Sequence, residues 1–573
     1  MAWRMGPKPN ITQMHDSYVQ QCLGVARIKF DDLAGSLKIL GEGVPQGVSF
    51  HRLPSDPSKL DDNEQFRLAL LGAEHAHQAG GSLKTETLEF LTTHSSTTDQ
   101  RVHQNVLLIV MPSVTGLGQA ESEIASWLAW GEVRAREGKN LSGIQLAEVE
   151  RNEREAKKGA ESAVRNSFEV VLYVDKTGAP QSRKFTMGAE AMFPALLREK
   201  DLRLFDQRIE PLAIMPGGLY PVWPSGQPAV QVKDLYQSFA RQPKLPKLIS
   251  PQMVVNTVVE GVTRGLLAVR YIRPDGSDEW FWRCPIPIPA WETNSEAWLP
   301  QNASIDSLPA SAVAPESLGG LWPTSDSPVL LSALCGWFDG THEFEEVVQG
   351  VAEKHPLPKV DYKVVHKAVA EAVERGDLWL VFGNDSVMGE KPTAIQLDAS
   401  ATLRRPPQPL RSLELLPTAL ADAWSTGDSP KTNVADLYAA LKTQRGIPWP
   451  SKQFLETLNG AINQGVLLRS TGSGELKALA ADGAVQIGTP SQMPPPPTPP
   501  QPQPSGGGVQ STAVRVNVGT LQDLADDIAP KLAKLLSGCS PEFEVRLKID
   551  GKLPTNLDEV NKLLEQIDPE WKL

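Results

Sequence analysis

The stretch with the clearest chemical potential is QNVLLIVMPSVTGLGQA, at residues 104–120. An apolar run ends at Met111, and two glycines, Gly116 and Gly118, follow before a helical pattern begins. A strand that passes through a glycine-containing turn into a helix is the start of many phosphate sites, because the free backbone N–H groups at a helix N-terminus bind anions. These residue types and their spacing make the turn a candidate nucleotide site.

The remaining parts of a nucleotide site are missing from this turn. A phosphate loop has the pattern G-x-x-x-x-G-K-[ST], and no segment of the chain contains it. After Met111 the next lysine is Lys139, beyond the expected helix. The dinucleotide pattern G-x-G-x-x-G also fails, because Glu121 stands at the place of its third glycine. We therefore predict a core strand and a structural turn, and no catalytic, cofactor-binding or metal-binding residue in this chain.

A second group of candidate residues lies in an internal repeat. The segments QMVVNTVVEGVTRG, KVVHKAVAEAVERG and KQFLETLNGAINQG align without a gap, with apolar residues at the same three offsets and a final glycine. The matching positions are Val254, Val258, Val262 and Gly265; Val365, Val369, Val373 and Gly376; and Phe454, Leu458, Ile462 and Gly465. Apolar steps of four fall on one face of a helix, and a glycine ends the helix in a left-handed conformation.

Each of these helices has the neighbours that a winged helix requires. Strand-like runs follow at 266–272, 378–382 and 466–468, each ending in a polar turn. A partner helix is predicted to begin at Val232, Phe344 and Val434. Helix, turn, second helix and hairpin is the order of a winged helix, so we predict three winged-helix-like domains.

The repeat raises the question of DNA binding, which needs Arg, Lys, Asn or Gln on the second helix and cations for the phosphates. The first copy offers Arg264, Arg270 and Arg273, our candidate nucleic-acid-binding residues. The second copy offers Lys363, His366 and Lys367, but also Glu371 and Glu374, and the third offers Lys452, Gln453, Asn459 and Asn463. Because the cations are sparse and the glutamates repel phosphate, the sequence favours an architectural or protein-binding role over DNA contact.

Composition limits the classes of protein that remain. The chain has 573 residues, a net charge of −12 and four cysteines that lie too far apart for a C-x-x-C zinc pair. The charge gives no general attraction to nucleic acid or to anionic membranes. No stretch has about 18 uncharged apolar residues, and the N-terminus lacks the apolar segment of a signal peptide. We expect a cytoplasmic protein without membrane contact.

The predicted fold is a mixed α/β N-terminal region, three winged-helix-like α+β domains and a small α/β tail domain. A Pro/Gly-rich segment that begins SQMPPPPTPP marks the last boundary. The predicted divisions are the α/β region with a long charged helix at 1–228, winged-helix-like domains at 229–284, 329–400 and 410–487, a Pro/Ser-rich insertion at 285–328, a linker at 488–510 and the tail module at 511–573.

Several of these features resemble a family of large bacterial P-loop ATPases catalogued as a domain of unknown function. The resemblance rests on QNVLLIVMPS, the helix ending in Trp127-Leu-Ala-Trp130, the long charged helix before SFEVVLYVD, and the opening WRMGPKPNITQM. The family is often encoded beside DNA methyltransferases and helicases in phage-defence islands and is similar in layout to the ATPase of BREX-type systems. Its phosphate loop precedes the region that resembles this chain, so the resemblance implies a C-terminal portion without the ATPase core.

Three alternatives for function remain, of which the resemblance implies the first. The first is a non-catalytic DNA-handling and protein-interaction region of a phage-defence ATPase, or a subunit that partners one, with a methyltransferase, a helicase or DNA as further partners. ATP would then bind only to the missing N-terminal module, and Arg101, expected in an exposed loop before the strand, could serve a neighbouring ATPase in trans. The second is an active ATPase with a degenerate nucleotide site. The third is a stand-alone winged-helix DNA-binding regulator.

Overall fold

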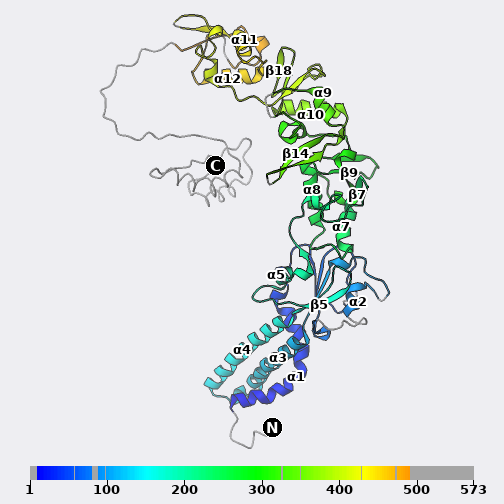
Figure 1. The fold of residues 1–573 in the computed structure, drawn as a ribbon. Helices are drawn as coiled ribbons and strands as arrows, with labels where there is room; N and C mark the ends of the chain where they lie inside the picture. The colour runs from blue at the N-terminus through cyan, green and yellow to red at the C-terminus, as the bar shows by residue number, and fades with distance from the viewer. Residues whose placement is uncertain are drawn as a thin grey trace, which may run out of the picture. The chain divides into compact units, whose positions relative to one another are not determined.

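The structure is a computed structural model of a mixed α/β protein with several small sheets (Figure 1). It describes residues 10–490, except 57–58, 80–87, 97, 324–326, 349, 428 and 472–473. The predicted tail module at 511–573 lies outside the described residues, as do all but the first three residues of the predicted linker. Among the described helices, none combines the length and the apolar character needed to cross a membrane.

A five-stranded sheet lies at the centre of the N-terminal region. Its order is β1 (Ser49–Arg52), β2 (Arg67–Leu70), β3 (Leu107–Met111), β4 (Val170–Val174) and β5 (Pro180–Lys184). The first three strands are parallel, and β4 and β5 are antiparallel to their neighbours. Every residue of β2, β3 and β4 is buried, which is why these strands read as apolar runs. The core strand predicted to end at Met111 is confirmed as β3.

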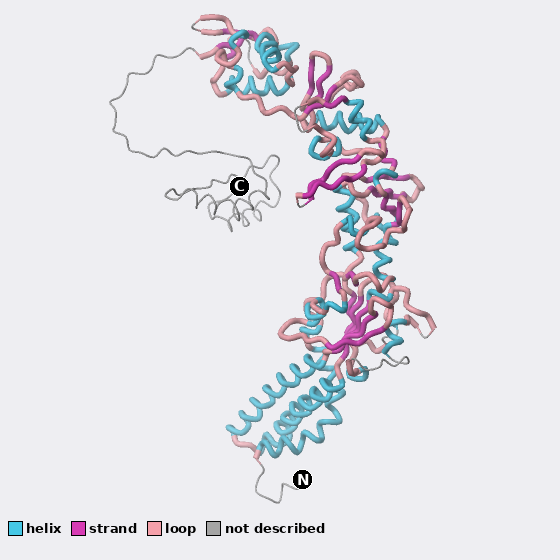
Figure 2. Tube along the Cα trace, viewed as in Figure 1, coloured by secondary structure: helices cyan, strands magenta, loops and turns pink. Residues whose placement is uncertain are grey.

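Three long helices extend from this sheet as a bundle (Figure 2). They are α1 (Ile11–Ser36), α3 (Val114–Glu137) and α4 (Gly143–Ser167), and α3 contacts both of the others. Capping boxes begin α1 at Asn10 and α4 at Ser142. The predicted long charged helix is confirmed as α4. Shorter helices complete the region: α2 (Leu88–Thr93) and α5 (Met192–Leu197).

From about residue 204 to 490 the same set of elements occurs three times, in what we call units 1, 2 and 3. Unit 1 contains β6 (Leu204–Phe205), α6 (Pro211–Ile214), β7 (Ala229–Gln231), α7 (Val232–Arg241), β8 (Lys247–Leu248), α8 (Gln252–Arg264), β9 (Ala268–Ile272), β10 (Asp278–Phe281) and β11 (Ser295–Trp298). Unit 2 contains β12 (Ser304–Ile305), η10 (Ala310–Val313), β13 (Val329–Leu330), α9 (Leu331–Trp337), β14 (Glu343–Val348), β15 (Val351–Pro356), β16 (Lys359–Val360), α10 (Tyr362–Arg375), β17 (Trp379–Phe382), β18 (Asp385–Val387) and β19 (Thr402–Arg404). Unit 3 contains η12 (Ser412–Leu415), β20 (Lys431–Asn433), α11 (Val434–Arg445), α12 (Ser451–Asn463), β21 (Leu468–Arg469), α13 (Leu479–Asp482) and β22 (Gln486–Gly488).

The sheets of the three units share one strand order. It is β10-β9-β11-β7 in unit 1 and β18-β17-β19-β13 in unit 2, and unit 3 has the same order without an outer strand, β21-β22-β20. The register also agrees, because the central residues Ala297, Leu403 and Ile487 each pair with both neighbouring strands and are each 0% exposed. The return strands β11, β19 and β22 were not predicted.

A short segment before each sheet packs against the second helix of its unit, and we call it the crossing segment. It spans 207–214 in unit 1, 306–313 in unit 2 and 408–415 in unit 3. Its two buried apolar residues have the same spacing in all three: Ile209 and Ile214, Leu308 and Val313, Leu410 and Leu415. In units 1 and 3 a helix threonine donates to this segment, Thr257 Oγ1 to the Ile209 carbonyl (3.1 Å) and Thr457 Oγ1 to the Leu410 carbonyl (3.3 Å).

One predicted helix is wrong. The segment from Phe344 forms the β14–β15 hairpin, and the partner helix of unit 2 is α9, earlier in the chain. Valines on both sides of a Gln-Gly pair favour a hairpin, and Gly350 has the positive φ (83°) that such a turn requires. The spacing of the glutamates and valines in this segment resembles a helical pattern, which led to the wrong prediction.

The helix-ending glycines and the Pro/Ser-rich stretch can also be compared with their predictions. Gly265, Gly376 and Gly465 all adopt the predicted left-handed conformation after their helices, with φ of 83°, 83° and 71°. The Pro/Ser-rich stretch at 285–328 supplies buried side chains to two cores, with Trp291 in that of unit 1 and Trp322 in that of unit 2.

Candidate nucleic-acid interface

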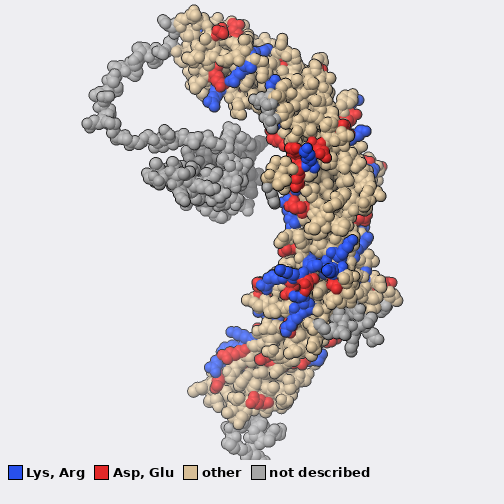
Figure 3. Space-filling view, in the orientation of Figure 1, with Lys and Arg blue, Asp and Glu red and all other residues tan. Residues whose placement is uncertain are grey.

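The exposed face of the second helix is the surface that would meet a DNA groove. The ungapped alignment places Gln252, Asn256 and Glu260 of α8 at the positions of Lys363, Lys367 and Glu371 of α10, and of Lys452, Glu456 and Gly460 of α12. The same face therefore carries different charges in the three units. On the side of the molecule shown in Figure 3, basic and acidic side chains lie interspersed.

Arg264, the first predicted DNA-binding residue, is surrounded by carboxylates. Its Nε and Nη2 donate to Glu346 of β14 at 3.1 and 2.9 Å, and Nη1 lies 3.3 Å from Glu210 and 3.4 Å from Glu260. Only 19% of the side chain is exposed. The hydrogen-bonded carboxylate of Glu346 raises the pKa of Arg264. A phosphate would have to displace Glu346 and approach two more negative charges.

The other two predicted arginines are also paired. Arg270 on β9 lies 2.8 Å from Asp278 and 3.3 Å from Glu296, and Arg273 lies 2.6 Å from Glu279. Each of the three arginines thus belongs to a different set of carboxylates. Such pairs are exchangeable at a surface, but they leave none of the three predicted arginines as a free positive charge.

The second helix of unit 2 carries unpaired cations. Within the described part of the chain, neither Lys363 nor Lys367 forms an ion pair. Tyr362 is 57% exposed and lies edge-on to His366, with ring centroids 5.8 Å apart. Burial lowers the pKa of His366, which therefore stays neutral at pH 7. A basic and aromatic surface of this kind can contact a nucleic-acid backbone.

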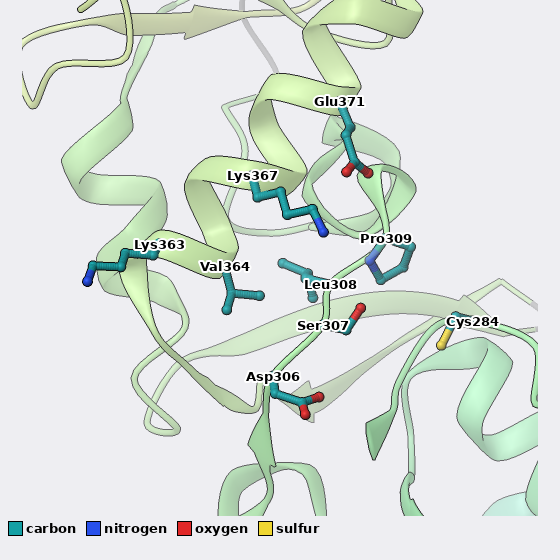
Figure 4. Close-up of a pocket in the computed structure, with 9 residues that line it drawn as sticks. All are labelled: Cys284, Asp306, Ser307, Leu308, Pro309, Lys363, Val364, Lys367 and Glu371. Carbon is teal, nitrogen blue, oxygen red and sulfur yellow. The ribbon is translucent and has the colours of Figure 1, made fainter. Parts of the chain in front are cut away.

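A pocket of about 390 Å³ lies between α10 and the crossing segment of unit 2. Its lining consists of Cys284, Asp306, Ser307, Leu308, Pro309, Lys363, Val364, Lys367 and Glu371. Lys367 and Glu371 point towards the crossing segment, whereas the ammonium of Lys363 points away (Figure 4). Burial raises the pKa of the Cys284 thiol, so this thiol is a poor nucleophile.

Two of the four predicted polar residues on α12, Lys452 and Asn459, are engaged with the protein itself. The Lys452 ammonium donates to the Gly389 carbonyl of unit 2. Asn459 donates to the Leu476 carbonyl (2.8 Å) and accepts from its N–H (2.9 Å). Unit 3 therefore offers less for DNA than its sequence suggested.

The glycine turn that opened the sequence analysis is closed by protein. Ser113 begins α3 and accepts from the Gly116 N–H at 2.8 Å, and its own N–H donates to the Ser167 carbonyl at 2.9 Å. A Cβ at Gly116 would lie 2.8 Å from Ser167 Cα, whereas one at Gly118 would meet nothing within 4 Å. Ser167, at the end of α4, therefore packs closely against Gly116 and leaves no room for a side chain at that position.

Arg101 is not an exposed loop arginine, as its place in the sequence had indicated. It is 3% exposed and donates to the carbonyls of Leu60 (3.0 Å), Asp61 (3.1 Å) and Leu91 (3.3 Å). A buried guanidinium that holds three carbonyls cannot reach a neighbouring ATPase. The described residues also contain no group of three side chains suited to a metal ion.

No protein-family model matches this chain, and no curated protein or solved structure shows significant similarity to it.

Proposed function

We propose that the chain is a non-catalytic protein-interaction and DNA-handling region of a phage-defence-associated ATPase, or a subunit that partners one. We further propose that units 1, 2 and 3 are winged-helix-like domains. Their strand, two helices and returning strands follow the order of that fold, with the second helix as the usual contact surface. A DNA methyltransferase or helicase is a further partner class under this proposal.

The crossing segment that packs against each second helix is the observation that favours protein interaction over DNA reading. A DNA-reading winged helix must expose the polar face of its second helix to base edges. In every unit here, a crossing segment with two buried apolar residues packs against that helix, and in unit 1 carboxylates take the arginines as well. A helix covered on one side in this way is suited to hold neighbouring modules together, and in unit 1 the exposed side that carries Gln252 and Asn256 offers no cation to a groove.

The rival function, ATP hydrolysis at a degenerate site, is tested with purified chain, ATP and Mg²⁺. We expect no hydrolysis above background, because the N-terminus of α3 is closed by Ser113 and Ser167. Gly118→Ala is the informative variant, since its new methyl group enters open space. Hydrolysis that this variant abolishes would overturn the non-catalytic assignment. Gly116→Ala is unsuitable, because it disrupts packing against Ser167.

A second candidate function, direct DNA contact, is favoured by the unpaired lysines of α10. Lys363 and Lys367 lie one helical turn apart and can each approach a phosphate. This contact would serve either the ATPase-associated role or a stand-alone DNA-binding regulator. It predicts a salt-dependent affinity without strong sequence preference, because phosphates carry no sequence information.

A further inference from the structure

The crossing segments of units 1 and 2 differ at one position that faces the second helix. The alignment through the buried residues Ile209 and Leu308 places Arg208 of unit 1 opposite Ser307 of unit 2. The same repeat alignment places Glu260 of α8 at the position of Glu371 in α10. An arginine and a glutamate in unit 1 therefore correspond to a serine and a glutamate in unit 2.

In unit 1 this glutamate has two arginine partners. The Arg208 guanidinium forms a hydrogen-bonded ion pair with Glu260, and Arg264 Nη1 lies 3.4 Å from the same carboxylate oxygen. The crossing segment thus supplies a cation to its own second helix. Unit 3 has Pro409 and Gly460 at the two positions, so neither charge is present there.

In unit 2 the carboxylate remains, but neither of the two arginines that contact it in unit 1 has a counterpart that pairs with it. Ser307 is too short to reach Glu371, and Arg375, which corresponds to Arg264, pairs instead with Asp377 at 3.1 Å. Among the described residues, Glu371 and Asp306 form no ion pair. Ser307 and Glu371 both line the pocket of about 390 Å³.

We propose that this pocket is a docking site for an arginine side chain of a partner protein, which takes the place that Arg208 holds in unit 1. The inference rests on the proposed protein-interaction function. Because Lys363 points away, Asp306, Glu371 and Lys367 surround the hollow with one negative charge in excess (Figure 4). A planar guanidinium pairs with a carboxylate through two parallel hydrogen bonds, a geometry that a lysine lacks.

The apolar part of the lining supports the same ligand. Leu308, Pro309 and Val364 provide a surface for the three methylene groups of an arginine, while Ser307 offers a hydroxyl acceptor beside them. Lys367 gives the pocket a preference for an arginine with a carboxylate close to it in the partner sequence. Since Arg208 itself is 63% exposed, a single docked arginine should bind weakly and act together with other contacts.

The test is ligand-observed NMR on the full chain with the tripeptide acetyl-Ala-Arg-Ala-amide. Matched peptides carry lysine, citrulline or aspartate in place of arginine. We expect saturation transfer to the arginine peptide above that to the lysine and citrulline peptides, with a dissociation constant on the order of 1 mM. Glu371→Gln should weaken the arginine peptide roughly fivefold. Ser307→Arg should remove its binding, because the new side chain fills the pocket.

Two variants serve as controls: Ser311→Arg adds the same side chain to the crossing segment outside the pocket, and Glu374→Gln removes an exposed charge from α10. Neither should change peptide binding. To exclude misfolding, the melting temperature of Ser307→Arg is measured, and we expect it to be no lower than that of the wild type. Any increase should vanish when Ser307→Arg is combined with Glu371→Gln.

Equal binding of arginine and citrulline peptides, or binding that survives Ser307→Arg, would overturn the proposal. Preferential binding of the aspartate peptide would also overturn it, because it would assign the pocket to an anion held by Lys367. These outcomes are separate from the ATP hydrolysis test, since the pocket can fail without any effect on the absence of hydrolysis.

Discussion

Units 1 and 2 have the same strand register and a crossing segment at the same place, yet the charged side chains on their second helices are paired differently. In unit 1, Arg264 pairs with Glu260 and with Glu346 of the β14 strand, and Arg208 pairs with Glu260. In unit 2, Lys363 and Lys367 are free of ion pairs in the described part of the chain. The fold fixes where the helix face lies, but residues from other elements decide whether that face can bind a charged partner.

The largest expected difference concerns the glycines that end α8 and α10. Gly265 and Gly376 share a φ of 83°, so alanine costs about 1–2 kcal/mol at either position. At Gly265 the new methyl group also meets Arg283 Nε at 2.6 Å and Trp282 at 3.2 Å, whereas at Gly376 it meets nothing within 4 Å. We expect Gly265→Ala to cost a further ~1–3 kcal/mol.

Hydrogen exchange followed by mass spectrometry measures the amide protection of α8 and of α10 separately. Protection of α8 should fall more in Gly265→Ala than protection of α10 falls in Gly376→Ala. Equal losses would show that the contacts of Gly265 with Trp282 and Arg283 do not distinguish the two units.

The next expected effect is a pH dependence of stability that arises in unit 1, where Lys247 bonds to residues of the N-terminal region. Lys247 is 0% exposed, and its Nζ donates to Asn105 Oδ1 and to the Val174 carbonyl, both at 2.7 Å. Burial lowers the pKa of Lys247 to about 7. Between this value and the ordinary lysine pKa, the unfolded chain binds more protons, so the free energy of unfolding rises with pH by up to ~1.4 kcal/mol per pH unit. Below about pH 7 both states are protonated and the contribution is constant.

Urea unfolding at pH 7, 8 and 9 measures this dependence, and Lys247→Met serves as the control. The pH-dependent increase should be smaller in the variant than in the wild type. Parallel curves for the two proteins would mean that Lys247 keeps its ordinary pKa in the folded state.

The smallest effect concerns the corresponding glutamates. Glu260→Gln removes two arginine partners and should lower the free energy of unfolding by about 0.5–1 kcal/mol, whereas Glu371→Gln removes none and should be nearly neutral. Thermal melts of the two variants give the comparison. A larger loss for Glu371→Gln would place an unrecognised cation beside α10.

The sequence predicted the elements whose signal is local. The buried strands, the long helix α4 and the three second helices all have a periodicity or an end signal within a dozen residues. The crossing segments could not be predicted, because the three segments share only two buried apolar positions. The first of these positions is Ile209, Leu308 or Leu410, and the second lies five residues later. The charge state of Arg264 could not be predicted either, since its main partner, Glu346, lies on a hairpin of the next unit. The signal for that hairpin was present at Gly350 but was outweighed by the helical pattern of its glutamates.

Our central claim is that the cations available for DNA contact are Lys363 and Lys367 of α10 and not the paired arginines of unit 1. Its most direct test is the salt dependence of binding to a fluorescent DNA duplex of about 20 base pairs, with circular dichroism to verify folding. Lys363→Ala with Lys367→Ala should weaken binding and reduce the slope against log salt by roughly 2. The triple variant Arg264→Ala, Arg270→Ala and Arg273→Ala should leave that slope unchanged. A slope that falls in the triple arginine variant and stays constant in the lysine variant would contradict the account.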